Sequence, residues 1–212
     1  MKFSIAVSAL SLVSTASAMN PIWTFDKSSD TADHGVKLTN DPVMGGLSVS
    51  TFNVTEPSLQ WEGTVKVVPS LAAPGFCNLE TDKMFFDKFP DASADSHLTL
   101  LVKSSLPDYK GFKASFGGGA LNPQFKSFKA DFYLDADKVD TESGFMRVDI
   151  PFTDFSNNWS SYTGEPIVKC SDDESVCPTA KNLKNLQQIG LWAEGVEGDF
   201  DLEILGIYSD TL

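Results

Sequence analysis

Apolar and polar residues alternate with a period of two in segment after segment of this 212-residue chain. Successive side chains of a β-strand point to opposite faces of a sheet, so this alternation predicts half-buried strands. Turn-forming residues separate the segments, and we find no amphipathic helix of useful length. The expected strands are residues 22–25, 47–54, 59–67, 76–80, 97–103, 109–116, 124–133, 145–150, 189–193 and 200–207. The chain is therefore predicted to be all-β, an antiparallel β-sandwich.

The composition supports one domain with a substantial core and restricts the partners. Hydrophobic residues make up 42% of the chain, with 16 Phe and 4 Trp among them. The formal net charge is −13, so the overall field repels nucleic acid and anionic lipid. No basic patch interleaved with aromatic residues offsets this charge, and we expect no nucleic-acid binding.

The first 18 residues are typical of a secretory signal peptide. Lys2 is followed by an apolar run and then by Ala16-Ser-Ala18, which has small residues where a signal peptidase cleaves. Residues 19–212 then form the mature domain, with a charge of −14 (−13 minus the +1 of Lys2). No later run is long and apolar enough to span a membrane. We expect secretion or retention in the endomembrane lumen, with a mitochondrion or a plastid as the alternative.

The cysteines and sequons agree with an oxidising compartment. Cys170 and Cys177 bracket a polar loop and are expected to form a disulfide, which leaves Cys77 as a buried free thiol. Asn158 and Asn53 each begin an N-glycosylation sequon. Asn158 is the preferred acceptor because it falls in a polar loop, whereas Asn53 falls in an expected strand.

Residues 40–48 read Asn-Asp-Pro-Val-Met-Gly-Gly-Leu-Ser and form the most informative stretch of the sequence. Asn, Asp, Pro and paired Gly residues favour a tight, structurally demanding corner. Val43 and Met44 are apolar, which an ordinary solvated loop would avoid, so we expect them to plug the loop. The alternative is a recognition loop with polar contacts from Asn40, Asp41 and Ser48.

With these residues in view, the chain resembles the complex I intermediate-associated protein 30 family. The likeness covers nearly all of the expected mature domain. It is carried by Trp23 and Phe25, residues 40–48, Trp61-Glu-Gly63, Gly75-Phe76, residues 145–150 with Pro151, Phe152 and Phe155, Ile189-Gly190, and Gly198-Asp-Phe200. The resemblance implies a galactose-binding-like jelly-roll sandwich and a non-enzymatic assembly chaperone. The positions that it marks for partner binding are Asn40, Asp41, Val43, Met44, Gly45, Gly46 and Ser48.

We therefore expect a binding module that contacts protein partners through the 40–48 loop and its neighbours. The alternative function is a secreted, lectin-like carbohydrate-binding module, with Trp159 and Tyr162 stacking on sugar rings. Trp192 lies in an apolar segment and is expected in the core. We expect no catalytic residue, cofactor or bound metal, because neither His34 nor His97 has a recognisable partner for general-base chemistry. The acidic turns around residues 172–174 and 199–201 leave calcium as a further alternative.

Overall fold

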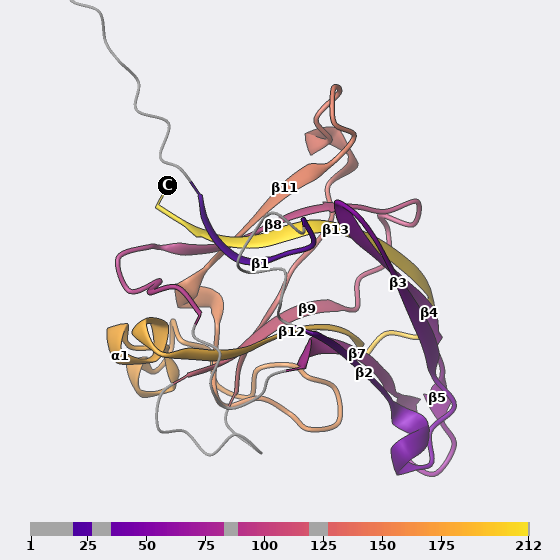
Figure 1. Ribbon diagram of the computed structural model, residues 1–212. Coiled ribbons are helices and arrows are strands. Elements are labelled where there is room, and N and C mark those ends of the chain that lie inside the picture. Colours follow the sequence, from indigo (N-terminus) through magenta and orange to yellow (C-terminus); the bar gives the residue numbers. More distant parts are fainter. Residues whose placement is uncertain (1–18, 27–34, 83–88, 119–126, 212) are drawn as a thin grey trace, which may run out of the picture.

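The chain folds into two packed antiparallel sheets in the computed structural model, which describes residues 19–26, 35–82, 89–118 and 127–211 (Figure 1). The expected signal peptide and His34 lie outside the described residues, as do residues 124–126 of one expected strand. The helices of the described ranges are all too short or too polar to span a bilayer.

A six-stranded sheet forms the upper layer in Figure 1, in the order β11-β8-β13-β4-β3, and β1 also pairs with β13. Its strands are β1 (Asn20–Thr24), β3 (Val49–Thr55), β4 (Ser58–Val65), β8 (His97–Lys103), β11 (Met146–Pro151) and β13 (Gly198–Asp210).

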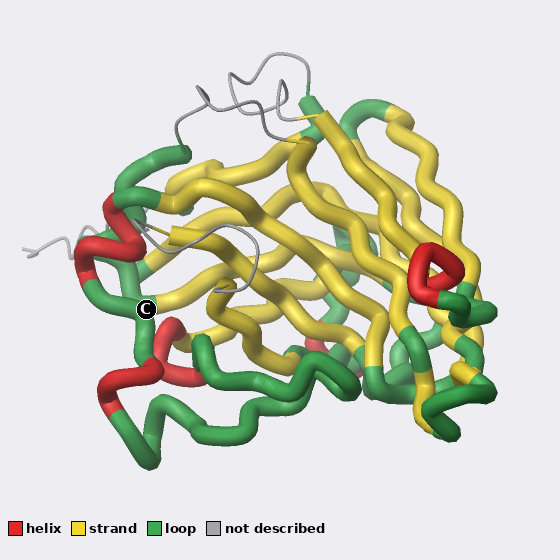
Figure 2. The backbone as a smooth tube through the Cα atoms, turned by 90° about the horizontal axis from the view of Figure 1, so that it is seen from below, coloured by secondary structure: helices red, strands yellow, loops and turns green. Residues whose placement is uncertain are grey.

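A five-stranded sheet forms the lower layer, in the order β10-β9-β12-β7-β2. Its strands are β2 (Gly35–Asn40), β7 (Phe76–Asp82), β9 (Phe112–Gly118), β10 (Ser127–Asp131) and β12 (Leu186–Glu194). Seen from below, the strands of the molecule run side by side, and loops and short helical turns surround them (Figure 2).

The remaining elements are short and lie in the connections. They are the two-residue strands β5 (Val67–Val68) and β6 (Ala73–Pro74), the turns η1 (Asp41–Met44), η2 (Ala136–Lys138), η3 (Phe152–Asp154) and η4 (Glu174–Val176), and the helix α1 (Ala180–Lys184).

The core lies between the sheets and is built from the alternate residues that the sequence pattern assigns to it. Leu98, Leu100 and Val102 of β8 are fully buried above, and Phe112, Ala114 and Phe116 of β9 are buried below. Phe112 joins the two layers, because its ring centroid lies 6.0 Å from that of Phe200 in β13. Burial of one such aromatic side chain stabilises the fold by about 1.5–3 kcal/mol.

The all-β, antiparallel sandwich is confirmed, and the differences from prediction are local. Residues 35–40 are not among the expected strands, yet they form β2 at the edge of the lower sheet. The strand expected from residue 109 begins at Phe112, because Tyr109 packs edge-on against Phe112 and donates its hydroxyl proton to the Val196 carbonyl. The five-residue helix α1 agrees with the absence of a long amphipathic helix from the sequence pattern.

Candidate functional site

The 40–48 loop is organised around the carboxylate of Asp41, which is only 2% exposed. Asp41 Oδ1 accepts a hydrogen bond from the Ser48 amide at 2.8 Å. Asp41 Oδ2 accepts from the Ser48 hydroxyl at 2.7 Å and from the Phe76 amide at 3.2 Å. The Ser48 Oγ atom in turn accepts from the Lys66 amide at 3.0 Å. One buried carboxylate therefore ties together the turn before β3, the residue after β4 and the start of β7.

Two glycines are required by the close approach of this carboxylate. A Cβ atom added to Gly75 would lie 1.5 Å from Asp41 Oδ2, and one added to Gly46 would lie 2.1 Å from Asp41 Cγ. Real Cβ atoms do not approach other heavy atoms so closely, and neither neighbour can move without breaking the network. The Gly45 backbone is left-handed, with φ +82°, which glycine adopts at no steric cost.

Asn40 closes the other side of the same loop. Its amide nitrogen donates to the Ser50 carbonyl at 3.3 Å, and its amide oxygen accepts from the Ser50 hydroxyl at 2.7 Å. Asn40, Asp41 and Ser48 thus satisfy backbone groups of their own chain, as the structural interpretation of the motif predicts. The side chains of Val43 and Met44 lie outside the described part of the structure, so their expected plugging role stays a prediction.

An apolar rim follows this loop along β3. Its members are Leu47, Val49, Phe52 and Val54, and each side chain is between 37% and 54% exposed. We call these four residues the β3 rim. Phe52 and Val54 lie on one face of the strand and Val49 lies on the other, so the rim offers exposed apolar side chains on both sides of the sheet edge. Such a concentration of exposed apolar side chains along one edge favours an interaction surface.

A second candidate surface is the outer face of the five-stranded sheet, where two lysines are buried. Lys113 Nζ donates to Asp131 and, at 2.6 Å, to Glu165. Lys129 Nζ donates to Glu194 at 2.6 Å and lies over the rings of Trp159 and Trp192, 4.0 and 3.7 Å from their centroids. Such cation–π contacts stabilise a desolvated charge. We call this set of charged and indole side chains the lysine–tryptophan cluster.

The two buried lysines differ in their proton affinity. Burial acts to lower the pKa of Lys113, but the hydrogen bonds to Asp131 and Glu165 outweigh it and hold this pKa above its ordinary value. Burial lowers the pKa of Lys129, and the Glu194 carboxylate opposes that effect without reversing it. Strand alternation places both lysines on the face opposite the core residues of their strands. The loop that carries Trp159 and Glu165 covers them, together with the Trp192 ring of β12 over Lys129.

The structure corrects the placement of Trp192. Its indole lies on the outer face of the sheet and not in the core, because residues 189, 191 and 193 of β12 fill the core instead. Its ring nitrogen donates to Ser115 Oγ at 2.8 Å, and its ring packs on Phe76 with centroids 5.6 Å apart.

The two residues expected to stack on sugars, Trp159 and Tyr162, have different surroundings. Trp159 is half-buried, donates its ring nitrogen to the Ser127 carbonyl at 2.8 Å and covers Lys129. Tyr162, three residues further on, is 65% exposed. Tyr162 is therefore free to meet a ligand, whereas Trp159 already has a structural contact on one ring face.

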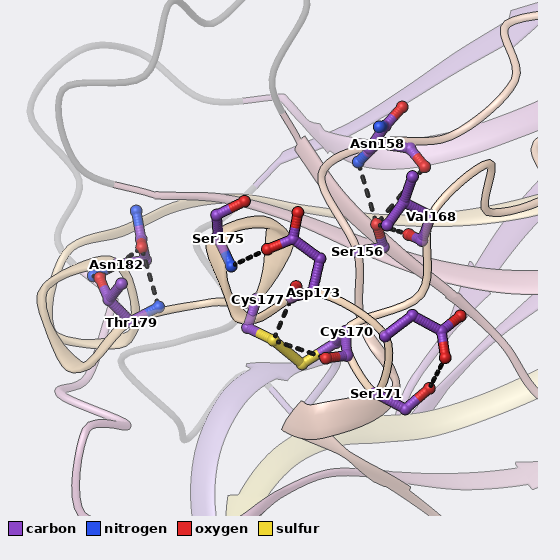
Figure 3. The surroundings of a disulfide bond; sticks show 11 residues. Ser156, Asn158, Val168, Cys170, Ser171, Asp173, Ser175, Cys177, Thr179 and Asn182 are labelled. Carbon is purple, nitrogen blue, oxygen red and sulfur yellow. Dashed lines mark hydrogen bonds between the residues drawn. A yellow bond between two sulfur atoms is a disulfide. The ribbon is translucent and has the colours of Figure 1, made fainter.

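The expected disulfide is present, and it staples the loop before α1. The sulfur atoms of Cys170 and Cys177 are bonded, and Cys77 is a buried free cysteine (Figure 3). Burial raises the pKa of the Cys77 thiol to about 11. Of the two sequon residues, Asn53 is exposed on β3 and Asn158 is half-buried, so accessibility does not favour the loop site that we preferred.

A shallow acidic groove of about 460 Å³ lies on the outer face of the six-stranded sheet, and Glu62, Asp199 and Asp201 line it beside Val49 and Thr51. Asp201 accepts hydrogen bonds from Ser104 and Ser105, and Asp199 accepts one from Thr64. Within the described ranges, no three His, Cys, Asp or Glu side chains are arranged to hold a metal ion. His97 opens β8 and its Nδ1 atom lies 2.7 Å from Ser96 Oγ.

Comparison with known proteins places the chain by both sequence and fold. Residues 23–204 match the family described as Complex I intermediate-associated protein 30 (CIA30). No curated protein sequence gives a significant match. Similar solved structures include the family 11 carbohydrate-binding module of the cellulosomal cellulase Lic26A-Cel5E of Clostridium thermocellum. That structure is 12% identical, has a TM-score of 0.52, and the alignment covers 92% of this chain and 97% of that one.

A solution structure of CtCBM11 is similar to the same degree. It is 13% identical, with a TM-score of 0.52, over 93% of this chain and 98% of that chain. At such identities the likeness establishes a shared β-sandwich fold.

Proposed function

The chain belongs to the complex I intermediate-associated protein 30 family, and from this premise we propose that it is a non-enzymatic binding and assembly module that holds protein partners at the β3 rim. The observation that supports this most directly is the exposure of Leu47, Val49, Phe52 and Val54 next to the family's most specific motif. Asn40, Asp41 and Ser48 of the motif form hydrogen bonds within the chain, so they hold the β3 rim in place. The contact with a partner is then made by the rim residues.

We also propose that this member works in the secretory pathway. The expected signal peptide, the disulfide between Cys170 and Cys177 and the two sequons support this location together. Sequencing the mature N-terminus from the native cell tests it. Cleavage after Ala18 with retention in the lumen or export is the expected result, and arrival in a mitochondrion or plastid would contradict it.

Carbohydrate binding is the second candidate function. Tyr162 is the most exposed aromatic side chain among the described aromatic residues, and it follows Trp159 by three residues in the same loop. Aromatic rings on a sheet face suit stacking on sugars, and the family 11 carbohydrate-binding modules share the sandwich.

A site-specific photo-crosslinker separates the two candidates. We would place it at Val49 on the β3 rim in one protein and at Tyr162 in another, and irradiate both in the native compartment. We expect protein adducts from Val49 that the nearby substitution Phe52→Asp removes, and none from Tyr162. A glycan array probed with the unmodified protein and with Tyr162→Ala tests the alternative. Tyr162-dependent glycan binding without Val49 adducts would overturn the protein-partner proposal.

A further inference from the structure

We infer that β3 is a docking edge for an extended segment of a partner protein, which adds to the six-stranded sheet as a further strand with apolar residues on one face and Lys or Arg on the other. This inference rests on the proposed function, because it specifies how the β3 rim holds its partner.

Within the described ranges, the outer edge of β3 presents backbone groups that the six-stranded sheet itself does not satisfy. Among the described strands β3 pairs only with β4, in register from Val49 opposite Thr64 to Thr55 opposite Ser58. Thr55 and Ser58 close a two-residue turn, so alternate residues from Thr55 backward exchange hydrogen bonds with β4. The backbone groups of Ser50, Phe52 and Val54 therefore point away from the sheet.

Asn40 supports this assignment, because its amide donates to the outward carbonyl of Ser50. Within the described ranges, no hydrogen bond to the outward groups of Phe52 or Val54 is found. An extended strand alongside β3 is the partner whose own N–H and C=O groups match that spacing.

The sequence of β3 lacks the usual protection of a sheet edge. Natural edge strands carry charged residues, proline or bulges that prevent pairing with another strand. Residues 49–55 read Val-Ser-Thr-Phe-Asn-Val-Thr, with no charge and no proline, and their register with β4 runs without a shift. Although the chain has a net charge of −13, none of its charged residues lies in this edge strand. The strand is therefore available for pairing with another strand.

The two faces of β3 specify different side chains in the added strand. Phe52 lies opposite Trp61 and Val54 lies opposite Leu59, so both belong to the core face although they are exposed. Apolar side chains of an added strand would cover them. Thr51 lies opposite Glu62 on the outer face, and Glu62 lies opposite Asp201 in the next strand.

Charge selects the partner. The acidic groove formed by Glu62, Asp199 and Asp201 adjoins Val49 and Thr51, so basic side chains of an added strand would meet carboxylates there. A second copy of β3 would bring no basic residue, and it would bring two chains of charge −13 together. The complementary occupant is thus a partner strand that alternates apolar and basic residues.

The first test uses an eight-residue fluorescent peptide that alternates Val and Lys. The protein is titrated into this peptide, and binding is followed by fluorescence anisotropy. Mass spectrometry first verifies that Asn53 of the protein carries no glycan. The matched control peptide has the same sequence with N-methyl groups along one edge, which removes strand pairing but keeps every charge. We expect N-methylation to weaken binding by at least tenfold, and replacement of Lys by Glu to abolish it. Equal binding of the methylated peptide would overturn the inference without any protein variant.

A protein variant completes the test. Val54→Pro removes an outward N–H group, and proline is tolerated at such edge positions because the β3–β4 ladder does not use that group. We expect at least tenfold weaker peptide binding with an unchanged circular dichroism spectrum. A dimer that Val54→Pro dissociates in sedimentation velocity would overturn the inference in favour of self-pairing.

The variant also separates the two proposals. Val49 crosslinks that survive Val54→Pro would overturn strand addition and leave the proposed function standing. Absence of crosslinks from position 49 in the protein without the Val54→Pro substitution would overturn the proposed function itself.

Discussion

Replacement of Asp41 by alanine tests the structural interpretation of the 40–48 motif most directly. The Asp41 side chain is 2% exposed and accepts three hydrogen bonds, from the Ser48 amide, the Ser48 hydroxyl and the Phe76 amide. The hydroxyl can turn toward the Lys66 carbonyl, which already lies 3.5 Å away. Asp41→Ala therefore leaves two amide donors without an acceptor.

The magnitude follows from the number of orphaned donors. Each unsatisfied buried donor costs about 1–3 kcal/mol, so we expect Asp41→Ala to lower the free energy of unfolding by about 4 kcal/mol. For a domain of this size that loss lowers Tm by about 8–16 °C. Urea unfolding followed by tryptophan fluorescence measures it, and the exposed Asp172 is the matched control, whose replacement by alanine should cost less than about 0.5 kcal/mol.

A double-mutant cycle then tests the packing argument. Gly75→Ala alone places a methyl group against Asp41 Oδ2 and should destabilise the fold severely. In the Asp41→Ala background the same methyl group has space, so its additional cost should fall sharply. A loss below about 1 kcal/mol for Asp41→Ala, or additive costs in the cycle, would refute the reasoning.

Three further outcomes follow from buried groups elsewhere. Lys129→Met leaves Glu194 buried without its cation and should cost about 3–5 kcal/mol in urea unfolding, whereas Lys129→Met with Glu194→Met should recover most of that loss; equal costs would contradict the buried pair. The double substitution Cys170→Ser with Cys177→Ser opens a short loop and should lower the free energy of unfolding by about 2–3 kcal/mol. An unchanged free energy of unfolding after reduction of the wild-type disulfide would contradict this expectation. Because burial raises the pKa of Cys77 to about 11, the unfolded chain releases this thiol proton first, so stability should fall as pH rises from about 8.5 toward that value. Cys77→Ala should remove that part of the alkaline loss.

The lysine–tryptophan cluster illustrates what sequence reasoning missed. Alternation placed Lys113 and Lys129 on the face opposite the core, which suggests exposure. Their acceptors Glu165 and Glu194 are 52 and 65 residues away along the chain. The sequence did contain an indication of burial, because each lysine directly follows a core phenylalanine, Phe112 or Phe128. The local pattern does not indicate which loop covers them.

The sequence alone determined most of the strands, the sandwich and the disulfide, because each follows from local rules: period-two alternation, turn residues, and two cysteines at the ends of a polar loop. It also marked residues 40–48 as a demanding backbone corner. Only the tertiary structure decided that Gly75 must be glycine for the sake of Asp41, that Trp192 faces outward, and that β3 is the last of the described strands in its sheet. These properties depend on which strands become neighbours, and that is settled by contacts between residues far apart in the chain.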